Sequence, residues 1–564
     1  MRCATDVTTC PPHCTAPWPR STASRDAPFE VRSHVIDCSP LSREADIERS
    51  DPAGSVRPVR FVELDPREAE IRLEASISGL ARKVPDLSAS KLLSRRQAVG
   101  LGVMGILLVA GAVVDPVDTF IVVVGAITLA YTAAIANRVV LFVRSRRLHT
   151  VERVGDEEAR SFPEAALPLY TVLVPAYREP EVIELLVHNV GRLEYPTDRL
   201  DVKLLLEADD AETIEALGDL DLGDHIEVLL IPPAEPRTKP KALNFGLSLA
   251  RGDLVTIYDA EDIPDPLQLK RAAIALGRLG PDVACVQAKL SYHNVDQNLL
   301  TRWFTLEYAM WFSLFLPGLV SLGAPLPLGG TSNHFRRSVL EVMGAWDPHN
   351  VTEDADLGIR LDREGFKVRV LESTTLEEAN SDFVNWVKQR SRWYKGYLQT
   401  WIIHMRHPLE LCGELGPTGF IQFNLFVGGT PMLAVLNPVF WAMTLVWFVG
   451  HPHLIKQLFP APVFYVGLLC WSFGNFTIAY LTIVTCRIIK RTELLKAALL
   501  VPAYWVMMSI AATKALTQLV LAPTFWEKTT HGLDKNCEAV LDLRACDDTD
   551  GASGPQTTSA PGRS

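Results

Sequence analysis

Long uncharged stretches alternate with charged ones along this chain of 564 residues. The first uncharged run covers residues 98–114, and a second covers residues 120–143 and is broken only by Arg138 near its end. At 1.5 Å per residue, these runs correspond to helices of about 25 and 36 Å, and a hydrocarbon core is about 30 Å thick. The pattern therefore predicts a pair of membrane-spanning helices, and a buried hairpin of a soluble protein is the less favoured alternative.

Charged residues flank this helix pair and indicate its orientation. Arg95 and Arg96 precede the pair, three arginines follow it between residues 144 and 147, and the short link at 115–118 contains two aspartates. Because basic residues collect on the cytoplasmic side of membrane segments, we expect both outer flanks in the cytoplasm.

Three further apolar blocks lie near the C-terminus. The first contains Asn437-Pro438 and is either two short spans or one kinked helix. Basic residues between 487 and 496 mark a cytoplasmic loop after the second block. The last block contains Pro502 and Lys514, which is compatible with an interfacial or re-entrant segment, so five or six spans are expected in total. The blocks cover residues 419–450, 462–485 and 498–522.

A stretch of about 270 residues separates the two membrane parts, which is enough for one large domain. Short β-type runs alternate there with helical periods, and this alternation is typical of a parallel, doubly wound sheet. In such sheets, ligands bind beyond the carboxyl ends of the strands. The expected strands are 169–177, 201–210, 225–233, 253–262 and 282–290, and the expected helices are 180–193, 241–252 and 265–280.

The composition argues against a nucleic-acid partner and against a disulfide framework, and it helps to set the domain limits. The net charge of −11 argues against a nucleic-acid partner, and the ten scattered cysteines form no disulfide framework. The first sixty residues are rich in Ser, Thr, Pro and Arg and show no apolar periodicity, which is typical of disorder. We therefore expect a mostly disordered cytoplasmic region (1–94), a transmembrane helix pair (95–147), an α/β domain with interfacial helices (148–418), C-terminal transmembrane or interfacial helices (419–535) and a disordered tail (536–564).

Polar side chains follow three of the predicted strands at the point where each strand ends. The carboxyl ends of parallel strands meet at one edge of the sheet, so these acids are expected to converge there. A solvated turn would explain one acidic strand end, but three at one edge indicate a site. A small divalent metal bound by one or two carboxylates and by substrate phosphates would neutralise them. The residues are Pro175, Tyr177 and Glu179; Glu207, Asp209 and Asp210; and Asp259, Glu261 and Asp262.

Two further motifs lie in the second half of the domain. Residues 352–354 (Thr-Glu-Asp) precede an apolar helix, so they are either an acidic helix N-terminus or part of a site. Residues 389–401 place Arg392 beside Trp393 in an otherwise acidic protein. That patch suits an amphipathic helix at lipid headgroups or a phosphate clamp beside a stacking platform. Because it leads directly into the membrane block, the predicted site lies close to the bilayer.

Together these motifs resemble the membrane-embedded glycosyltransferases of family 2, whose relatives include cellulose synthase catalytic subunits and other β-glycan synthases. The resemblance extends over residues 95–535. VPAYRE (174–179) resembles the nucleotide-binding start of the family's GT-A domain, and DAED (259–262) stands at its D-x-D position. TED (352–354) matches its catalytic-base motif and QRSRW (389–393) matches Q-x-x-R-W. The resemblance implies an α/β GT-A fold, Rossmann-like with a doubly wound mixed sheet, in a cytoplasmic domain inserted between transmembrane α-helices.

The resemblance also implies roles for individual residues at the donor side. It assigns the nucleotide sugar to residues of the first strands and the metal, Mg²⁺ or Mn²⁺, to Asp259 and Glu261. Since Glu261 replaces the family's second Asp, Asp262 is an alternative ligand. The nucleotide-sugar residues so implied are Pro175, Tyr177, Glu179, Glu207, Asp209, Lys239, Asn244 and Asp259.

At the acceptor side, the resemblance makes Asp354 the general base, with Thr352 and Glu353 in the same motif. Gln389, Arg392 and Trp393 are expected to hold the diphosphate and the acceptor end. The loop at 329–337 resembles the family's acceptor loop. The segment FWEKTTHG (525–532) takes the place of its gating loop, with Lys528 and Thr529 reaching the diphosphate.

The function implied is inverting transfer of a sugar from a UDP-sugar to a growing, β-linked glycan, with export through the membrane as a further possibility. An alternative is single addition to a lipid carrier. A nucleotide-regulated transporter is disfavoured because the C-terminal blocks contain few polar residues, chiefly Asn424, Asn475 and Lys514. The expected partners are a UDP-sugar donor, a glycan or lipid-linked acceptor and the lipid bilayer, with no nucleic acid. The expected location is the plasma membrane, with several spans and a cytoplasmic catalytic domain.

Overall fold

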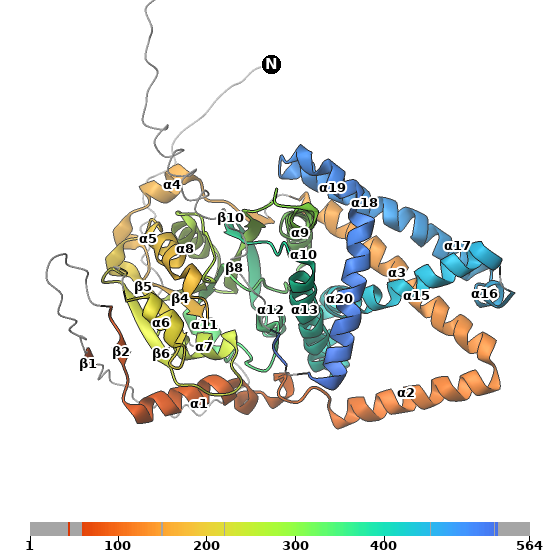
Figure 1. The fold of residues 1–564 in the computed structure, drawn as a ribbon, viewed down its shortest axis with the longest axis horizontal. Helices are drawn as coiled ribbons and strands as arrows, with labels where there is room; N and C mark the ends of the chain where they lie inside the picture. The colour runs from red at the N-terminus through yellow and green to blue at the C-terminus, as the bar shows by residue number, and fades with distance from the viewer. Residues whose placement is uncertain are drawn as a thin grey trace, which may run out of the picture.

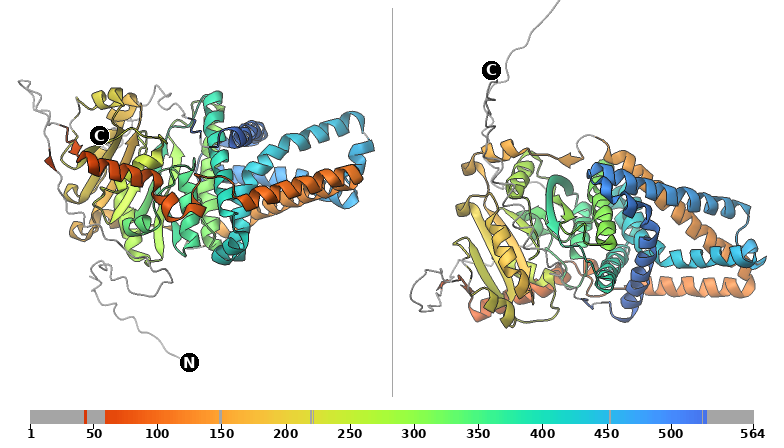
Figure 2. Two further views of the ribbon diagram at one scale, coloured as in Figure 1. Left: turned by 90° about the horizontal axis from the view of Figure 1, so that it is seen from below. Right: turned by 45° about the horizontal axis from the view of Figure 1, so that its top comes forward.

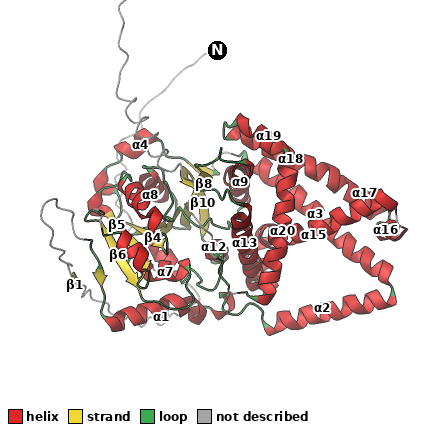
Figure 3. Cartoon of the chain, in the orientation of Figure 1, coloured by secondary structure: helices red, strands yellow, loops and turns green. Residues whose placement is uncertain are grey.

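An eight-stranded mixed sheet forms the centre of the domain between the two membrane parts. The computed structural model describes residues 43–44, 59–147, 150–218, 220, 222–451, 453–523 and 525–527. In spatial order the strands are β3 (Val151–Glu152), β10 (Lys367–Glu377), β8 (Val283–Tyr292), β9 (Asn333–Arg336), β7 (Leu254–Ile257), β4 (Tyr170–Ala176), β5 (Leu200–Glu207) and β6 (Ile226–Ile231). β9 runs antiparallel to both of its neighbours, whereas all other pairs are parallel. The predicted doubly wound mixed sheet is thus confirmed, and Figures 1 and 3 show its labelled strands β4, β5, β6, β8 and β10 on the side of the molecule away from α2 and α17.

The central strands are apolar on both faces because helices cover the sheet on both sides. In β4, Leu173 packs into one hydrophobic core, and its neighbours Val172 and Val174 pack into the other. Helix α7 (Lys239–Leu247) contributes Leu243 to the first core. Helices α5 (Ile183–Gly191) and α8 (Gln268–Arg278) cover the second core.

Strand register places the polar strand ends at one level. Ala176 of β4 is paired with Leu206 of β5, so Tyr177, just after β4, lies level with Glu207, the last residue of β5. Leu173 is paired with Ile257 of β7, which brings Asp259 level with Pro175. The predicted convergence of three strand ends at one edge is therefore confirmed.

Further short elements complete the domain. They are β1 (Arg43–Glu44) and β2 (Val62–Glu63), α4 (Asp156–Ser161), α6 (Ala211–Ala216), α11 (Arg337–Val342), α12 (Glu353–Arg363), and the 3₁₀ turns at Glu164–Ala166, Pro180–Val182 and Thr197–Arg199. The long helix α13 (Phe383–His404) lies between this domain and the apolar helices, as Figure 1 shows.

Six helical segments are long and apolar enough to cross a membrane, by length and composition, among the residues that the structure describes. Figure 2 shows that α2 and α3 project from the α/β domain together with the C-terminal helices. The segments are α2 (Arg95–Val114), α3 (Pro116–Ser145), Leu299–Leu322 (α9, Leu299–Met310, and α10, Leu316–Leu322, joined by a π-helical turn), Pro408–Gly450 (α14, Pro408–Phe423, and α15, Gly429–Gly450), Ala461–Ile488 (α17, Ala461–Leu469, and α18, Asn475–Ile488) and α20 (Val501–Leu521).

Three features of these segments go beyond the sequence pattern. Leu299–Leu322 lies within the predicted α/β domain, and about half of its apolar window is buried. Pro438 sits inside a continuous α15, whereas the chain bends earlier, at Gly416 (φ 66°) before Pro417. Short helices α16 (His453–Leu458) and α19 (Leu495–Leu499) and the 3₁₀ turn Thr492–Leu494 complete the C-terminal part.

The region before α2 is more ordered than its sequence indicates. Helix α1 (Pro66–Lys83) packs on α7, and the 3₁₀ turn Pro85–Leu87 follows it. The Arg406 guanidinium donates to the carbonyl oxygen of Asp86 at 2.6 Å, which ties this region to the end of α13. The prediction of a mostly disordered region through residue 94 is therefore wrong for residues 66–94. The sequence did not predict α1 because the helix buries only a short stripe, Ser76 and Leu80. A helix of this kind is stabilised by tertiary packing, which the local sequence does not show.

Candidate active site

A cavity of about 1310 Å³ begins at the carboxyl ends of β4, β5 and β7 and continues between the apolar helices. Its lining combines residues from strand ends, from the start of α12 and from α13. The structure therefore brings together segments that lie more than 200 residues apart in the chain. The predicted site residues on its wall are Pro175, Tyr177, Glu179, Glu207, Lys239, Asp259, Glu261, Thr352, Glu353, Asp354, Gln389, Arg392 and Trp393.

Glu207 ends β5 as a buried carboxylate with one oxygen unused. Its Oε1 forms an ion pair with the buried Lys241 Nζ at 2.7 Å. Its Oε2 is buried and has no hydrogen-bond partner in the described part of the chain. Burial raises the pKa of Glu207, and Lys241 opposes that shift. Because an unpaired buried acceptor is costly, this oxygen is suited to accept a hydrogen bond from a ligand N–H group.

Arg237 connects Asp209 to the cavity. Its guanidinium lies 2.8 Å from Asp209 Oδ2 and donates to the Tyr177 hydroxyl at 3.2 Å. Arg237 lines the cavity, whereas Asp209 stands behind it. Nothing in the sequence pattern singles out Arg237, which stands two residues before Lys239.

Asp259 forms an ion pair with Lys239, whose Nζ also donates to the carbonyl oxygen of Gly330 at 2.8 Å. Asp259 lines the cavity, whereas Asp262 does not. Its buried carboxyl accepts a hydrogen bond from the Asp259 backbone N–H at 2.8 Å and another from the Thr331 hydroxyl. The suggestion that Asp262 is a metal ligand is therefore corrected: this carboxyl shapes the turn that presents Asp259.

Four acidic residues form one wall of the cavity: Asp259, Glu261, Glu377 and Glu378. Burial raises the pKa of Glu377 well above its usual range, and repulsion from Asp262, Asp259 and Glu261 adds to this. No group of three or more His, Cys, Asp or Glu side chains in the described ranges is arranged as a complete ligand set. Two carboxylates with donor phosphates as the remaining ligands nevertheless fit a hard divalent cation, which would offset this repulsion.

Helix α12 begins with the Thr352-Glu353-Asp354 motif at the wall of the cavity. A Cβ atom on Gly396 would lie 2.4 Å from Thr352 Oγ1, so the start of α12 contacts α13 closely. Burial raises the pKa of Asp354 to about 6, and the cations Lys239 and Arg392 oppose the shift. Burial and the neighbouring Asp354 raise the pKa of Glu353 to about 8. The carboxyl of Asp354 thus has a pKa of about 6, and two cations, Lys239 and Arg392, lie near it.

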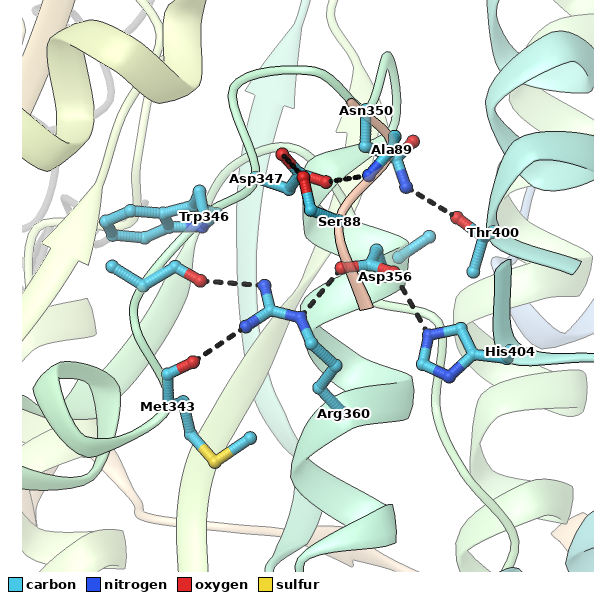
Figure 4. A network of polar contacts seen from close by, with 12 residues as sticks. Ser88, Ala89, Met343, Trp346, Asp347, Asn350, Asp356, Arg360, Thr400 and His404 are labelled. Carbon is cyan, nitrogen blue, oxygen red and sulfur yellow. Dashed lines mark hydrogen bonds and ion pairs between the residues drawn. The ribbon is translucent and has the colours of Figure 1, made fainter. Parts of the chain in front are cut away.

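A buried network fixes α12 against α13, as Figure 4 shows. Asp356 lies 2.7 Å from Arg360 Nε and 3.0 Å from His404 Nε2. Arg360 also donates to the carbonyl oxygens of Met343 at 2.9 Å and Ala345 at 2.7 Å. All three side chains are buried, so the network sets the position of Asp354, two residues before Asp356.

Helix α13 carries the QRSRW motif along the cavity. Arg392 lies over the Trp526 ring at 4.8 Å and is electrostatically coupled to Glu353, Asp354 and Asp259. Burial lowers the pKa of Arg392, and these acids oppose the shift. Trp393 is stacked on Tyr308 with 6.1 Å between ring centroids. Gln389 accepts a hydrogen bond from Asn380 at 3.0 Å.

Asn244 does not line the cavity. Its Nδ2 donates to the carbonyl oxygens of Ser76 at 3.0 Å and Trp346 at 2.9 Å, and its Oδ1 accepts from the Trp346 N–H at 3.1 Å. The expectation that Asn244 lies at the nucleotide is therefore corrected. Its amide joins α1, α7 and the loop before α12.

The segment before the proposed gating residues crosses α13. Gln399 donates to the carbonyl oxygen of Pro523 at 2.8 Å, and Glu527 lies 2.8 Å from Lys514. Trp526 reaches the cavity. Lys528 and Thr529 lie outside the described residues.

Part of the chain matches a family model and several curated proteins. Residues 168–396 match the family model described as "Glycosyltransferase like family 2". The probable glycosyltransferase YdaM of Bacillus subtilis is 29% identical over 234 residues, which cover 41% of this chain and 55% of that protein. The probable glucomannan 4-beta-mannosyltransferase 1 of Arabidopsis thaliana is 28% identical over 46% of this chain and 49% of its own length.

The beta-monoglucosyldiacylglycerol synthase of Trichormus variabilis is 26% identical over 43% of this chain and 53% of its own length. The chain thus spans about half the length of the curated relatives it matches. Among solved structures, the mannosyltransferase PcManGT from Pyrobaculum calidifontis in complex with GDP-Man and Mn²⁺ is 19% identical, with a TM-score of 0.46. It covers 71% of this chain and 99% of that structure.

Proposed function

From the premise that residues 168–396 of this chain form a family 2 glycosyltransferase domain, we propose that the protein transfers a sugar from a UDP-sugar to a growing glycan, with inversion at the anomeric carbon. The observation that carries this proposal is the shared cavity of Asp259, Asp354 and Arg392. It joins an acidic wall, a carboxyl with a raised pKa and a guanidinium in one space. Those are the groups that displacement of a nucleoside diphosphate requires.

Donor binding begins at the strand ends. The unpaired Glu207 Oε2 accepts the ring N–H of uracil, which ends the cost of leaving that oxygen buried and unbonded. Tyr177 and Arg237 form a hydrogen-bonded pair beside it and bound the nucleoside. The donor is thereby oriented with its diphosphate toward Asp259 and Arg392.

The diphosphate gains negative charge as its bond to the sugar breaks. Arg392 faces this position and donates to the phosphate oxygens, which stabilises the leaving group. Asp259 and Glu261 would hold a divalent cation, Mg²⁺ or Mn²⁺, which supplies electrostatic stabilisation of the diphosphate when bound. Lys239 forms an ion pair with Asp259, which keeps that carboxylate ionised and oriented.

Asp354 is the general base of the proposed reaction. Its carboxylate accepts the proton of the acceptor hydroxyl as that oxygen forms a bond to C1 of the sugar. The bond from C1 to the diphosphate oxygen breaks on the opposite face, and its electron pair leaves with UDP. One displacement of this kind inverts C1, so an α-linked donor gives a β-linked product.

The acceptor end of the cavity favours a growing glycan. Trp393 and Tyr308 form a stacked aromatic wall there, and such faces bind sugar rings by packing. The cavity continues between the apolar helices, where further aromatic residues such as Trp441 and Trp505 line it. This continuation supports passage of the product toward the membrane.

Transfer of a single sugar to a lipid carrier is the second candidate. The cavity reaches the outer surface of the helices, because its lining residues Phe448, Tyr465 and Trp471 are 70%, 67% and 56% exposed. A lipid acceptor can enter through such an opening.

The flanking arginines favour a multi-pass protein of the plasma membrane with the family 2 domain in the cytoplasm.

One experiment tests the reaction itself. Purified full-length protein in detergent, supplied with UDP-sugars, GDP-sugars and Mg²⁺ or Mn²⁺, is expected to release UDP from one UDP-sugar and to lose at least about tenfold of that rate in EDTA. Readouts are UDP release and the size of the product. Turnover with GDP-sugars alone would contradict the assigned donor, and a full rate in EDTA would contradict a metal at Asp259 and Glu261.

A second prediction concerns pH. Since Asp354 has a pKa near 6, its carboxyl is protonated and inactive as a base below that value and becomes the active carboxylate above it. The rate of transfer at saturating donor is therefore expected to rise about tenfold per pH unit below pH 6 and to level off above it. A profile of kcat from pH 4.5 to 8 checks this. A flat profile through pH 6 would remove Asp354 as the titrating base.

A further inference from the structure

Arg138 is a cation of helix α3 that faces the cavity without a counterion. It lies in the apolar part of α3 and lines the cavity together with Tyr131 from two turns earlier. In the described part of the chain, no carboxylate lies within ion-pair distance of its guanidinium and no acceptor lies within hydrogen-bond distance. A charged side chain inside a membrane segment marks a functional site when it is not paired within the protein.

The other polar groups around Arg138 are already satisfied. Asn137 and Gln422 exchange hydrogen bonds at 2.9 and 2.7 Å. The Tyr131 hydroxyl donates to the carbonyl oxygen of Leu433 at 2.9 Å and also contacts Asn437. Among these four side chains of the described part of the chain, Arg138 alone has no hydrogen-bond or ion-pair partner.

The only acid near Arg138 on the described cavity wall is Glu307, and other groups occupy it. Arg390 donates to both Glu307 oxygens, through Nη1 at 2.9 Å and through Nη2. The Tyr504 hydroxyl also donates to Glu307, at 2.6 Å. One carboxylate thus faces two guanidinium groups, and this part of the cavity has a net positive charge that a bound anion would neutralise.

With the hydrocarbon core centred on α3, Arg138 lies near the boundary between lipid headgroups and acyl chains. Helix α3 has 30 residues, so it is about 45 Å long and extends beyond a core of about 30 Å. Arg138 lies seven residues, about 10 Å, from the end of α3 that joins the family 2 domain. A long guanidinium side chain at that depth reaches the level of lipid phosphates.

A lipid has a route to this position. Trp471 lines the same cavity and is 56% exposed on the outer surface of the apolar helices, and Cys470 beside it contacts Thr132, six residues before Arg138 on α3. The exposed cavity lining at this position is apolar and aromatic, which suits acyl chains rather than a free phosphate ion. The cavity therefore offers an apolar entrance and, deeper inside, one unpaired cation.

We propose that Arg138 binds the phosphate of an anionic membrane lipid that enters the cavity from the side. A guanidinium matches two phosphate oxygens with a pair of parallel hydrogen bonds, whereas glycan hydroxyls would leave its charge uncompensated. This inference goes beyond the proposed sugar transfer and does not depend on it, because lipid binding is measured with no nucleotide sugar present.

The test uses the full-length protein in detergent and native mass spectrometry with phosphatidylglycerol or phosphatidylcholine of equal chain length. Wild type is expected to retain one phosphatidylglycerol with a Kd about tenfold lower than that for phosphatidylcholine. Arg138→Gln is expected to raise the phosphatidylglycerol Kd about tenfold, to the phosphatidylcholine value. Arg146→Gln, which removes an exposed arginine at the end of the same helix, is the matched control and is expected to change the Kd less than about twofold.

Three outcomes would overturn the proposal. They are equal wild-type affinity for both lipids, an equal loss in the Arg146 variant, and displacement of the lipid by equimolar glycerol 1-phosphate, which would identify a soluble phosphate as the ligand. If Arg138→Gln does not fold, Arg138→Lys keeps the charge but loses the paired hydrogen bonds, and it is expected to raise the phosphatidylglycerol Kd about threefold. The headgroup preference of the wild type then decides the question.

Discussion

Asp354→Asn is expected to lower kcat by about 10²–10⁴-fold and to leave the Kd for the UDP-sugar nearly unchanged. The amide has the shape of the carboxyl but cannot accept the proton of the acceptor hydroxyl. Asp354 lies on the cavity wall beside Lys239 and Arg392, so the substitution keeps the packing of the site. Initial rates of UDP release at saturating donor, together with donor binding by calorimetry, measure both quantities.

Asp362→Asn provides a matched control for this variant. Asp362 lies on the same helix, α12, and burial raises its pKa to about 6, as it does for Asp354. Asp362 does not line the cavity, so its substitution is expected to change kcat less than about twofold. Normal turnover in Asp354→Asn, or an equal loss in Asp362→Asn, would show that Asp354 is not the base.

The sequence predicted the edge of the sheet well because that prediction needed only local information. A strand that ends in Glu207 and another that is followed by Asp259 can be recognised from their own apolar runs, and parallel pairing then brings their ends together. The short motifs around Asp354 and Arg392 were visible for the same reason. The structure adds that all four residues face one cavity.

The site residues that the sequence did not predict act through long-range contacts. Arg237 reaches Asp209 and Tyr177 only because two strand ends are adjacent in the sheet. Glu307 gives no signal in a helix whose apolar pattern looks like that of its neighbours, yet it pairs with Arg390 across 83 residues. Such pairings depend on helix packing, which periodicity does not specify.

Asn244 and Asp262 were misplaced for a related reason. Both stand inside motifs whose other members face the cavity, and position in a motif does not show which way a side chain points. Asn244 follows Lys239 by five residues on α7, and this spacing turns its amide away from the cavity toward α1. Asp262 is turned inward because its carboxyl caps the backbone of Asp259. The same geometry makes both residues structural, whereas Asp259, paired with Lys239, stays on the cavity wall.

Arg392→Gln is expected to lower kcat by about 10²–10³-fold and to raise the donor KM, because the guanidinium stabilises charge that grows on the diphosphate. Arg392 is held over Trp526 and coupled to three acids that would otherwise repel the donor phosphates. Its loss therefore weakens both the ground-state complex and, more strongly, the transition state. Steady-state kinetics with the UDP-sugar separate the two effects.

Lys388→Gln is the matched control for the Arg392 variant. It removes a cation one turn earlier on α13 that does not line the cavity, so kcat and KM are expected to stay within about twofold of wild type. Comparing the binding of UDP with that of uridine, which lacks the phosphates, then distinguishes a phosphate contact of Arg392 from a general packing role. If Arg392 acts on the diphosphate, binding of UDP should weaken more than binding of uridine. Equal losses for UDP and uridine would instead mean that Arg392 only supports the fold of the site.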